Sequence, residues 1–89
     1  MHAPKIRTIS YDPLFEREMA AIEPNVRRAD ELLDGAVTIL SRSPESGFQL
    51  GKSSVWFVPG HTVDLVIYYT FDEDQVYFLS IQKAFPTEL

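Results

Sequence analysis

The sequence predicts an α+β fold, in which an antiparallel sheet of about four strands carries an N-terminal αα-hairpin on one face. Apolar residues recur every three or four positions in two consecutive segments of the first half, as in amphipathic helices. The second half instead contains apolar runs separated by turn residues, a pattern typical of strands. With 89 residues, the chain has room for one domain, residues 1–89, with the element order β-α-α-β-β-β.

The first half begins with a β-branched stretch at residues 5–10, which we expect to form an edge strand. Asp12 can accept a hydrogen bond from a first-turn amide and Pro13 suits the first helical position, so the first helix starts here. It should end near Glu23, because a residue before proline avoids the helical conformation. Pro24 can then open the second helix, which should end around residues 41–43. The apolar positions of this second helix are Val26, Ala29, Leu33, Ala36, Val37 and Leu40.

Residues 43–54 are mostly small or polar, so we expect a loop of about a dozen residues, longer than a usual connection. Three strands follow at residues 55–58, 63–71 and 76–83, separated by turn residues, and they predict an antiparallel meander. The middle strand is apolar on both faces and should therefore lie centrally in the sheet. The helical hairpin would cover one face of this sheet and leave the other face open.

Composition excludes several classes of function. The chain has 13 acidic and 8 basic side chains, and its net charge of −5 repels nucleic-acid phosphates on average. Without cysteine it has no disulfide, no thiolate metal site and no cysteine nucleophile. No apolar run approaches the ~18 residues that a membrane span needs, and the first residues lack the apolar core of a signal peptide. We therefore expect a cytoplasmic protein without a membrane contact or a cofactor.

Two local patterns imitate known sites. The run Gly51-Lys52-Ser53 resembles the end of a phosphate-binding loop, but here a helix precedes the run and a strand follows it, which is the reverse of the required order. His61 has Asp64 three positions later, yet nothing in the sequence orders them with a serine into a catalytic triad. With His2 as the other histidine and no paired ligand spacing, we expect no metal site.

Three segments carry a resemblance to a known family. They are Leu40-Ser41-Arg42-Ser43-Pro44-Glu45-Ser46-Gly47, Leu65-Val66-Ile67-Tyr68-Tyr69-Thr70-Phe71-Asp72 and Val76-Tyr77-Phe78-Leu79-Ser80-Ile81. Together with the element order, they resemble the RelE/ParE toxin superfamily over nearly the whole chain. Members are toxins of bacterial type II toxin–antitoxin pairs, and a cognate antitoxin holds them inactive. The RelE type cuts mRNA in the ribosomal A site, and the ParE type poisons DNA gyrase.

For an mRNA endoribonuclease, the resemblance implies catalytic and binding residues on the sheet. Lys52 and Lys83 would contact phosphates, and Tyr68 and Phe85 would stack on bases. RelE-type nucleases also carry an arginine just before the aliphatic-tyrosine stretch, where this chain has Asp64 or Leu65. An acidic or aliphatic side chain cannot stabilise the charge that develops on the phosphate during cleavage.

The charge distribution differs from that expected of an RNA-gripping sheet. Residues 1–47 hold six basic and eight acidic side chains, a net −2, whereas residues 48–89 hold two basic and five acidic side chains, a net −3. The sheet half is thus the more acidic half, the reverse of a nuclease that binds RNA through its sheet.

Two functions remain open at this point. The chain is either the toxin of a type II toxin–antitoxin pair, acting on translation or on gyrase, or a non-catalytic protein-binding module that keeps the fold without a basic active face. Whether it is an enzyme is left open by the sequence. Both functions predict a protein partner, for which a cognate antitoxin is the first candidate and a second copy of the chain is the alternative. A hydrophobic patch beside the central strand could receive such a partner.

Overall fold

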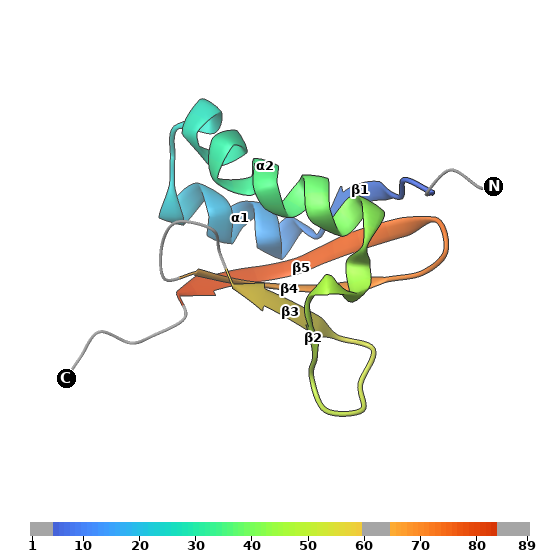
Figure 1. The fold of residues 1–89 in the computed structure, drawn as a ribbon. Helices are drawn as coiled ribbons and strands as arrows, with labels where there is room; N and C mark the ends of the chain where they lie inside the picture. Colours follow the sequence, from blue (N-terminus) through green and yellow to red (C-terminus); the bar gives the residue numbers. More distant parts are fainter. Residues whose placement is uncertain (1–4, 60–64, 84–89) are drawn as a thin grey trace.

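The computed structural model describes residues 5–59 and 65–83, which form one five-stranded sheet with both helices on one of its faces (Figure 1). The predicted α+β class is confirmed, with one strand more than expected. The elements in chain order are β1 (Thr8–Tyr11), α1 (Pro13–Ile22), α2 (Val26–Arg42), a short 3-10 helix (Pro44–Ser46), β2 (Phe48–Gln49), β3 (Trp56–Pro59), β4 (Leu65–Phe71) and β5 (Gln75–Lys83).

Capping residues set the starts of both helices. The Asp12 carboxylate accepts a hydrogen bond of 2.8 Å from the Leu14 amide, and Pro13 occupies the first helical position of α1, as predicted. The prediction that Pro24 opens the second helix is wrong. Asn25 caps α2 through a 3.0 Å hydrogen bond from the Arg28 amide to its side chain. An amide side chain at the cap satisfies a free first-turn N–H group, which proline cannot do.

The strands lie in the order β1-β5-β4-β3-β2. β1 pairs in parallel with β5, and the other neighbours are antiparallel. The predicted edge position of the first strand and the central position of β4 are confirmed. Within the predicted loop at residues 43–54, the structure places a 3-10 turn and β2, whose two residues are too few to give a periodic signal.

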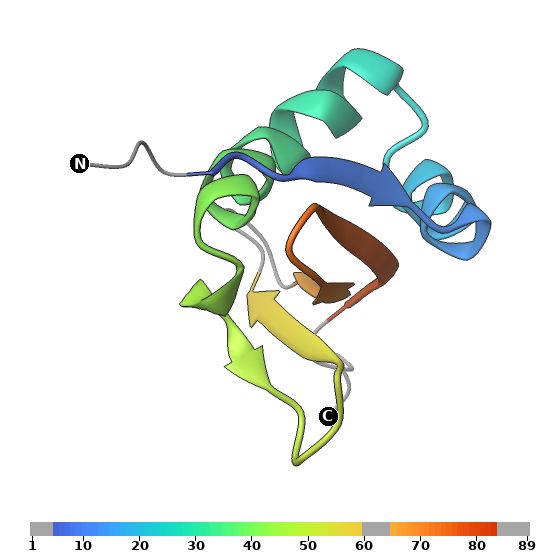
Figure 2. The same cartoon turned by 90° about the vertical axis from the view of Figure 1, so that its right-hand side faces the viewer.

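The core lies between the helices and the sheet, with contributions from both helices, β4 and β5. In Figure 2 the helices lie on the side of β1 and β5, while β3 and β2 extend away from α1. Tyr69 is fully buried, and its hydroxyl donates a hydrogen bond to the Pro44 carbonyl just after α2. This bond attaches the end of α2 to the central strand. The buried hydrophobic residues are Phe15, Met19, Leu33, Leu40, Leu65, Ile67, Tyr69, Val76, Phe78 and Ile81.

Candidate functional site

A row of three aromatic side chains crosses the sheet face that the helices leave uncovered. Strand side chains alternate between faces, and Ile67 and Tyr69 point into the core, so Tyr68 between them points away from the helices. The backbone register places Phe57 of β3 opposite Tyr68, and Phe48 of β2 opposite Phe57. The ring centroids are 5.6 Å apart for Phe48 and Phe57, and 6.3 Å apart for Phe57 and Tyr68.

This aromatic row, Phe48, Phe57 and Tyr68, is partly open to solvent. Phe48 is 58% exposed at the edge of the sheet, and the other two rings are half-buried. Exposed aromatic rings of this kind offer a large, rigid contact area with little side-chain entropy to lose on binding. The row is therefore the best candidate for a binding surface on the open face.

The surroundings of the aromatic row carry no charge within the described strands. The register places Ser80 beside Tyr68 and Gln82 beside Val66, both on β5. Thr70 of β4 and Tyr77 of β5 form the next pair on this face. In residues 5–59 and 65–83, no lysine, arginine or histidine belongs to a strand position that faces this side of the sheet. The open face is thus neutral, with aromatic and hydroxyl groups.

Two carboxylates lie where this face meets the helices. The pairing of β1 with β5 ends at Phe78, so the Ile81 amide has no partner in β1. Glu18 of α1 accepts hydrogen bonds from that amide at 3.1 Å and from the Ser80 hydroxyl at 2.7 Å. The Tyr77 hydroxyl donates to the Asp12 carboxylate at 3.0 Å, and this hydrogen bond raises the pKa of Tyr77. The charge that borders the open face along β5 is therefore negative.

Of the residues predicted to act on RNA, Tyr68 belongs to the aromatic row but the two lysines do not. Lys52 lies in the loop between β2 and β3, which projects from the body of the molecule (Figure 1). Lys83 ends β5 opposite the buried Leu65, which places it on the helix-bearing side of the sheet. Phe85 lies outside the described residues, as do His2, His61 and Asp64.

The two lysines also lie at opposite ends of the sheet. Lys83 pairs with Leu65 of β4. The loop that contains Lys52 begins after Gln49, and the register across β3 places Gln49 in line with Tyr69 of β4. Leu65 and Tyr69 are separated by four positions, or roughly 13 Å at the rise of a strand. The structure thus does not bring Lys52 and Lys83 together around Tyr68.

Phe48 and Phe57 belong to the surface but were not singled out from the sequence. Their position depends on which residues face each other across three strands, and sequence alone does not give this register. Trp56, by contrast, pairs with Tyr69 on the helix side, lies 5.5 Å from the Phe71 ring and packs against the core. Among the described residues, the structure contains no cluster of three or more histidine or acidic side chains that could hold a metal ion.

No helix in the described part of the chain has the length and apolar character to cross a membrane. No protein-family model and no curated protein matches the sequence. The fold, however, matches solved structures from toxin–antitoxin pairs, at identities of 20% or less in the three described next.

A chain of the RelBE2 toxin–antitoxin complex from Mycobacterium tuberculosis gives a TM-score of 0.73 at 18% identity, over 96% of this chain and 100% of that chain. A chain of the chromosomal ParDE toxin–antitoxin system from P. aeruginosa gives a TM-score of 0.73 at 10% identity, over 91% of this chain and 99% of that chain. The isolated E. coli RelE toxin gives a TM-score of 0.66 at 20% identity, over 92% of this chain and 88% of that chain. Element order, sheet topology and these superpositions establish that the chain has the RelE/ParE toxin fold.

Proposed function

We propose that this protein is the toxin-type component of a toxin–antitoxin pair and that it acts by binding a protein target, not by cutting mRNA. The observation that carries the proposal is the neutral aromatic row on the open sheet face. The fold supports a toxin-type protein, and the chemistry of the open face favours one of the activities that the resemblance implies.

Cleavage of RNA places demands that this face meets poorly. The scissile phosphate and its neighbours are anionic, so binding requires cations, and the developing charge requires a preorganised donor. On the described strands the open face presents only neutral side chains, and Glu18 and Asp12 add negative charge at its border. Lys52 and Lys83 lie away from Tyr68, so each could contact a phosphate only outside the aromatic row.

Binding of a protein suits the same surface better. Interfaces between proteins are depleted in charged residues at their centre and enriched in aromatic ones, which often dominate the binding energy. The exposed Phe48 and the half-buried Phe57 and Tyr68 fit that composition. Of the two target classes implied by the resemblance, DNA gyrase is therefore favoured over ribosome-bound mRNA.

A second function rests on the same neutrality. A protein with this fold but no basic face could bind its antitoxin-like partner, or a second copy of itself, without harming the cell. This is the non-catalytic binding module. The two functions are distinguished by the growth of the host, which a toxin would arrest and a binding module would not.

An antitoxin partner is part of the proposal under the toxin function. Structures that share this fold include an intact E. coli RelBE toxin–antitoxin complex and the E. coli DinJ-YafQ toxin–antitoxin complex. For the present chain, the partner would be a protein whose co-expression relieves any growth arrest.

The proposal is tested by tightly induced expression in a bacterial host, with and without co-expression of a partner gene. We expect growth arrest that the partner gene relieves, together with inhibition of supercoiling by purified gyrase in the presence of the protein. Unchanged growth despite abundant folded protein would favour the binding module. Growth arrest with normal gyrase activity would remove gyrase as the target.

A further inference from the structure

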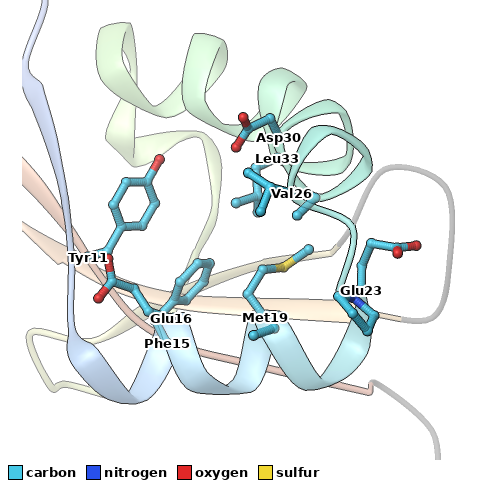
Figure 3. A pocket seen from close by; sticks show the side chains of 11 residues that line it. Tyr11, Phe15, Glu16, Met19, Glu23, Val26, Asp30 and Leu33 are labelled. Atoms are coloured by element: carbon cyan, nitrogen blue, oxygen red, sulfur yellow. The ribbon is translucent and has the colours of Figure 1, made fainter.

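A pocket of about 330 Å³ opens on the helix-bearing side, between α1 and α2 (Figure 3). Its floor is apolar, with Phe15 and Met19 from α1 and Leu33 from α2, all of them buried core residues. In Figure 3 these side chains point into the space between the two helices, and Tyr11 of β1 closes one end. The floor is thus formed by side chains of the hydrophobic core.

The apolar lining continues out of the pocket onto the surface. Val26 at the start of α2 is 75% exposed, and the neighbouring lining residues Ala20 and Pro24 are exposed as well. The apolar surface is thus continuous from the buried floor to an exposed side chain, which suits contact with apolar groups of a partner. The pocket volume suits a few aliphatic side chains, at the low end of the range for ligand sites.

The charged side chains that line the pocket are all negative. Glu16, Glu23 and Asp30 line it, and no lysine, arginine or histidine does. None of the three forms an ion pair within residues 5–59 and 65–83, where the single pair joins Lys5 and Asp74. Arg27 and Arg28 are exposed near the start of α2 but do not line the pocket.

The charge around the pocket also acts on Tyr11. Burial raises the pKa of this tyrosine, and the negative charges of Asp30 and Glu16 raise it further. A cation placed among these carboxylates would be attracted by the same field.

We propose that this pocket is the docking site for a basic amphipathic helix of a partner protein, whose apolar side chains enter between α1 and α2 while its lysines or arginines face Glu16, Glu23 and Asp30. Helix-in-groove recognition uses apolar anchors at helical spacing, and two neighbouring helices offer a third helix the ridges and grooves it packs against. Flanking cations add specificity and speed to the association. An acidic helix would be repelled at the same positions.

This site is independent of the proposed action through the aromatic row, because the two surfaces lie on opposite sides of the sheet. Binding at the helical pocket can therefore be measured whether or not the protein is toxic. A failure of one proposal leaves the other unaffected.

The test uses two fluorescent synthetic peptides with the same leucine pattern at helical spacing. Lysines flank the leucines in one peptide and glutamates in the other. By fluorescence anisotropy with the whole protein, we expect the lysine peptide to bind about ten-fold more tightly at low ionic strength, from several weak surface ion pairs. Added salt should reduce this preference because it screens exposed charges.

Matched variants locate the binding. The triple variant Glu16→Gln, Glu23→Gln, Asp30→Asn should remove the preference for the lysine peptide. The control variant Glu31→Gln, Asp34→Asn changes two carboxylates of α2 that lie outside the pocket, and it should keep the preference. Val26→Ser should weaken binding of both peptides, and Ile39→Ser, which removes a 55% exposed residue elsewhere on α2, should not.

Three results would overturn the proposal. Equal affinity for the two peptides, or no binding of the lysine peptide, would remove the basic helix as the occupant. A dimer of the whole chain that Val26→Ser dissociates in sedimentation would assign the pocket to a second copy. Circular dichroism of each variant confirms that loss of binding is not loss of folding.

Discussion

Phe57 and Tyr68 face each other across β3 and β4, with ring centroids 6.3 Å apart, on the side of the sheet that carries no helix. Phe48 extends this pair to the edge of the sheet, 5.6 Å from Phe57. The resulting surface is aromatic and neutral where RNA cleavage would require cations. The relationship between these rings therefore favours recognition of a protein.

The aromatic row predicts a specific loss of function. Phe48→Ser removes the most exposed ring of the row and should weaken growth arrest while leaving the fold intact, because Phe48 is 58% exposed and stands at an edge. Ile39→Ser removes a similarly exposed apolar side chain from α2 and serves as the control. Growth curves at equal levels of soluble protein give the comparison. Equal arrest with both variants would exclude Phe48 from the acting surface.

Two glycines predict opposite changes in stability. A methyl group at Gly47 would collide with the buried Tyr69 hydroxyl and lie 2.6 Å from the Phe57 carbonyl oxygen. Gly47→Ala should therefore lower the free energy of unfolding by about 1–3 kcal/mol, as overpacking does. Gly35 lies inside α2, and apart from its chain neighbours and the backbone of its own helix no atom lies within 4 Å of the place a methyl group would take, so Gly35→Ala should raise the free energy of unfolding by about 0.5–1 kcal/mol. Urea unfolding measures both changes, and a stabilising Gly47→Ala would contradict the packing described for Tyr69.

The turn between β4 and β5 predicts a dependence of stability on pH. The Asp72 carboxylate accepts hydrogen bonds from the amides of Asp74 at 2.8 Å and Gln75 at 3.0 Å, which lower its pKa from the ordinary 3.8. The pKa of Asp72 is lower in the folded state than in the unfolded state, so its ionised form stabilises the fold. This contribution of Asp72 to stability is complete above pH 3.8 and is lost as the pH falls through the folded-state pKa. Asp72→Asn keeps an acceptor oxygen and should lose less stability in acid than the wild type.

Glu73→Gln is the control for this acid effect, because it removes one negative charge from the same turn without touching the two amides. Thermal unfolding from neutral pH down to below 3.8 compares the three proteins. Identical acid profiles for the wild type and Asp72→Asn would show that Asp72 does not contribute.

The acidic pocket predicts a shift in the titration of Tyr11. Burial is the main cause of its raised pKa, followed by the charges of Asp30 and Glu16. Asp30→Asn combined with Glu16→Gln should lower that pKa yet leave it above the ordinary value of 10.0, because the burial remains. NMR titration with labelled tyrosine follows the ring directly, and Glu31→Gln is the control. An unchanged pKa in the double variant would contradict the electrostatic coupling across the pocket.

Local signals predicted most of the fold. The cap at Asp12, the periodicity of α2 and the apolar runs of β4 and β5 depend on neighbouring residues, and the structure confirms each. The start of α2 was misplaced at Pro24 because proline and Asn25 are both helix-start signals, and the side-chain hydrogen bond decides between them. β2 and the parallel pairing of β1 with β5 depend on contacts between distant segments, which periodicity does not contain.

The candidate site could be predicted only in part for the same reason. Tyr68 was singled out through the resemblance, as a ring for stacking on a base, and it does lie on the open face. Its partners Phe48 and Phe57 became apparent only from the register of three strands. The roles of Lys52, Lys83, Tyr68 and Phe85 in RNA cleavage stay a prediction of the resemblance.

Mapping of mRNA 5′ ends in cells arrested by induced expression tests the central claim most directly, because it separates action on a protein from cutting of mRNA. We expect arrest without new 5′ ends inside codons, and the same result for Lys83→Ala and Lys52→Ala. New ends inside codons that disappear with Lys83→Ala would contradict the claim and assign the protein a ribosome-dependent nuclease activity.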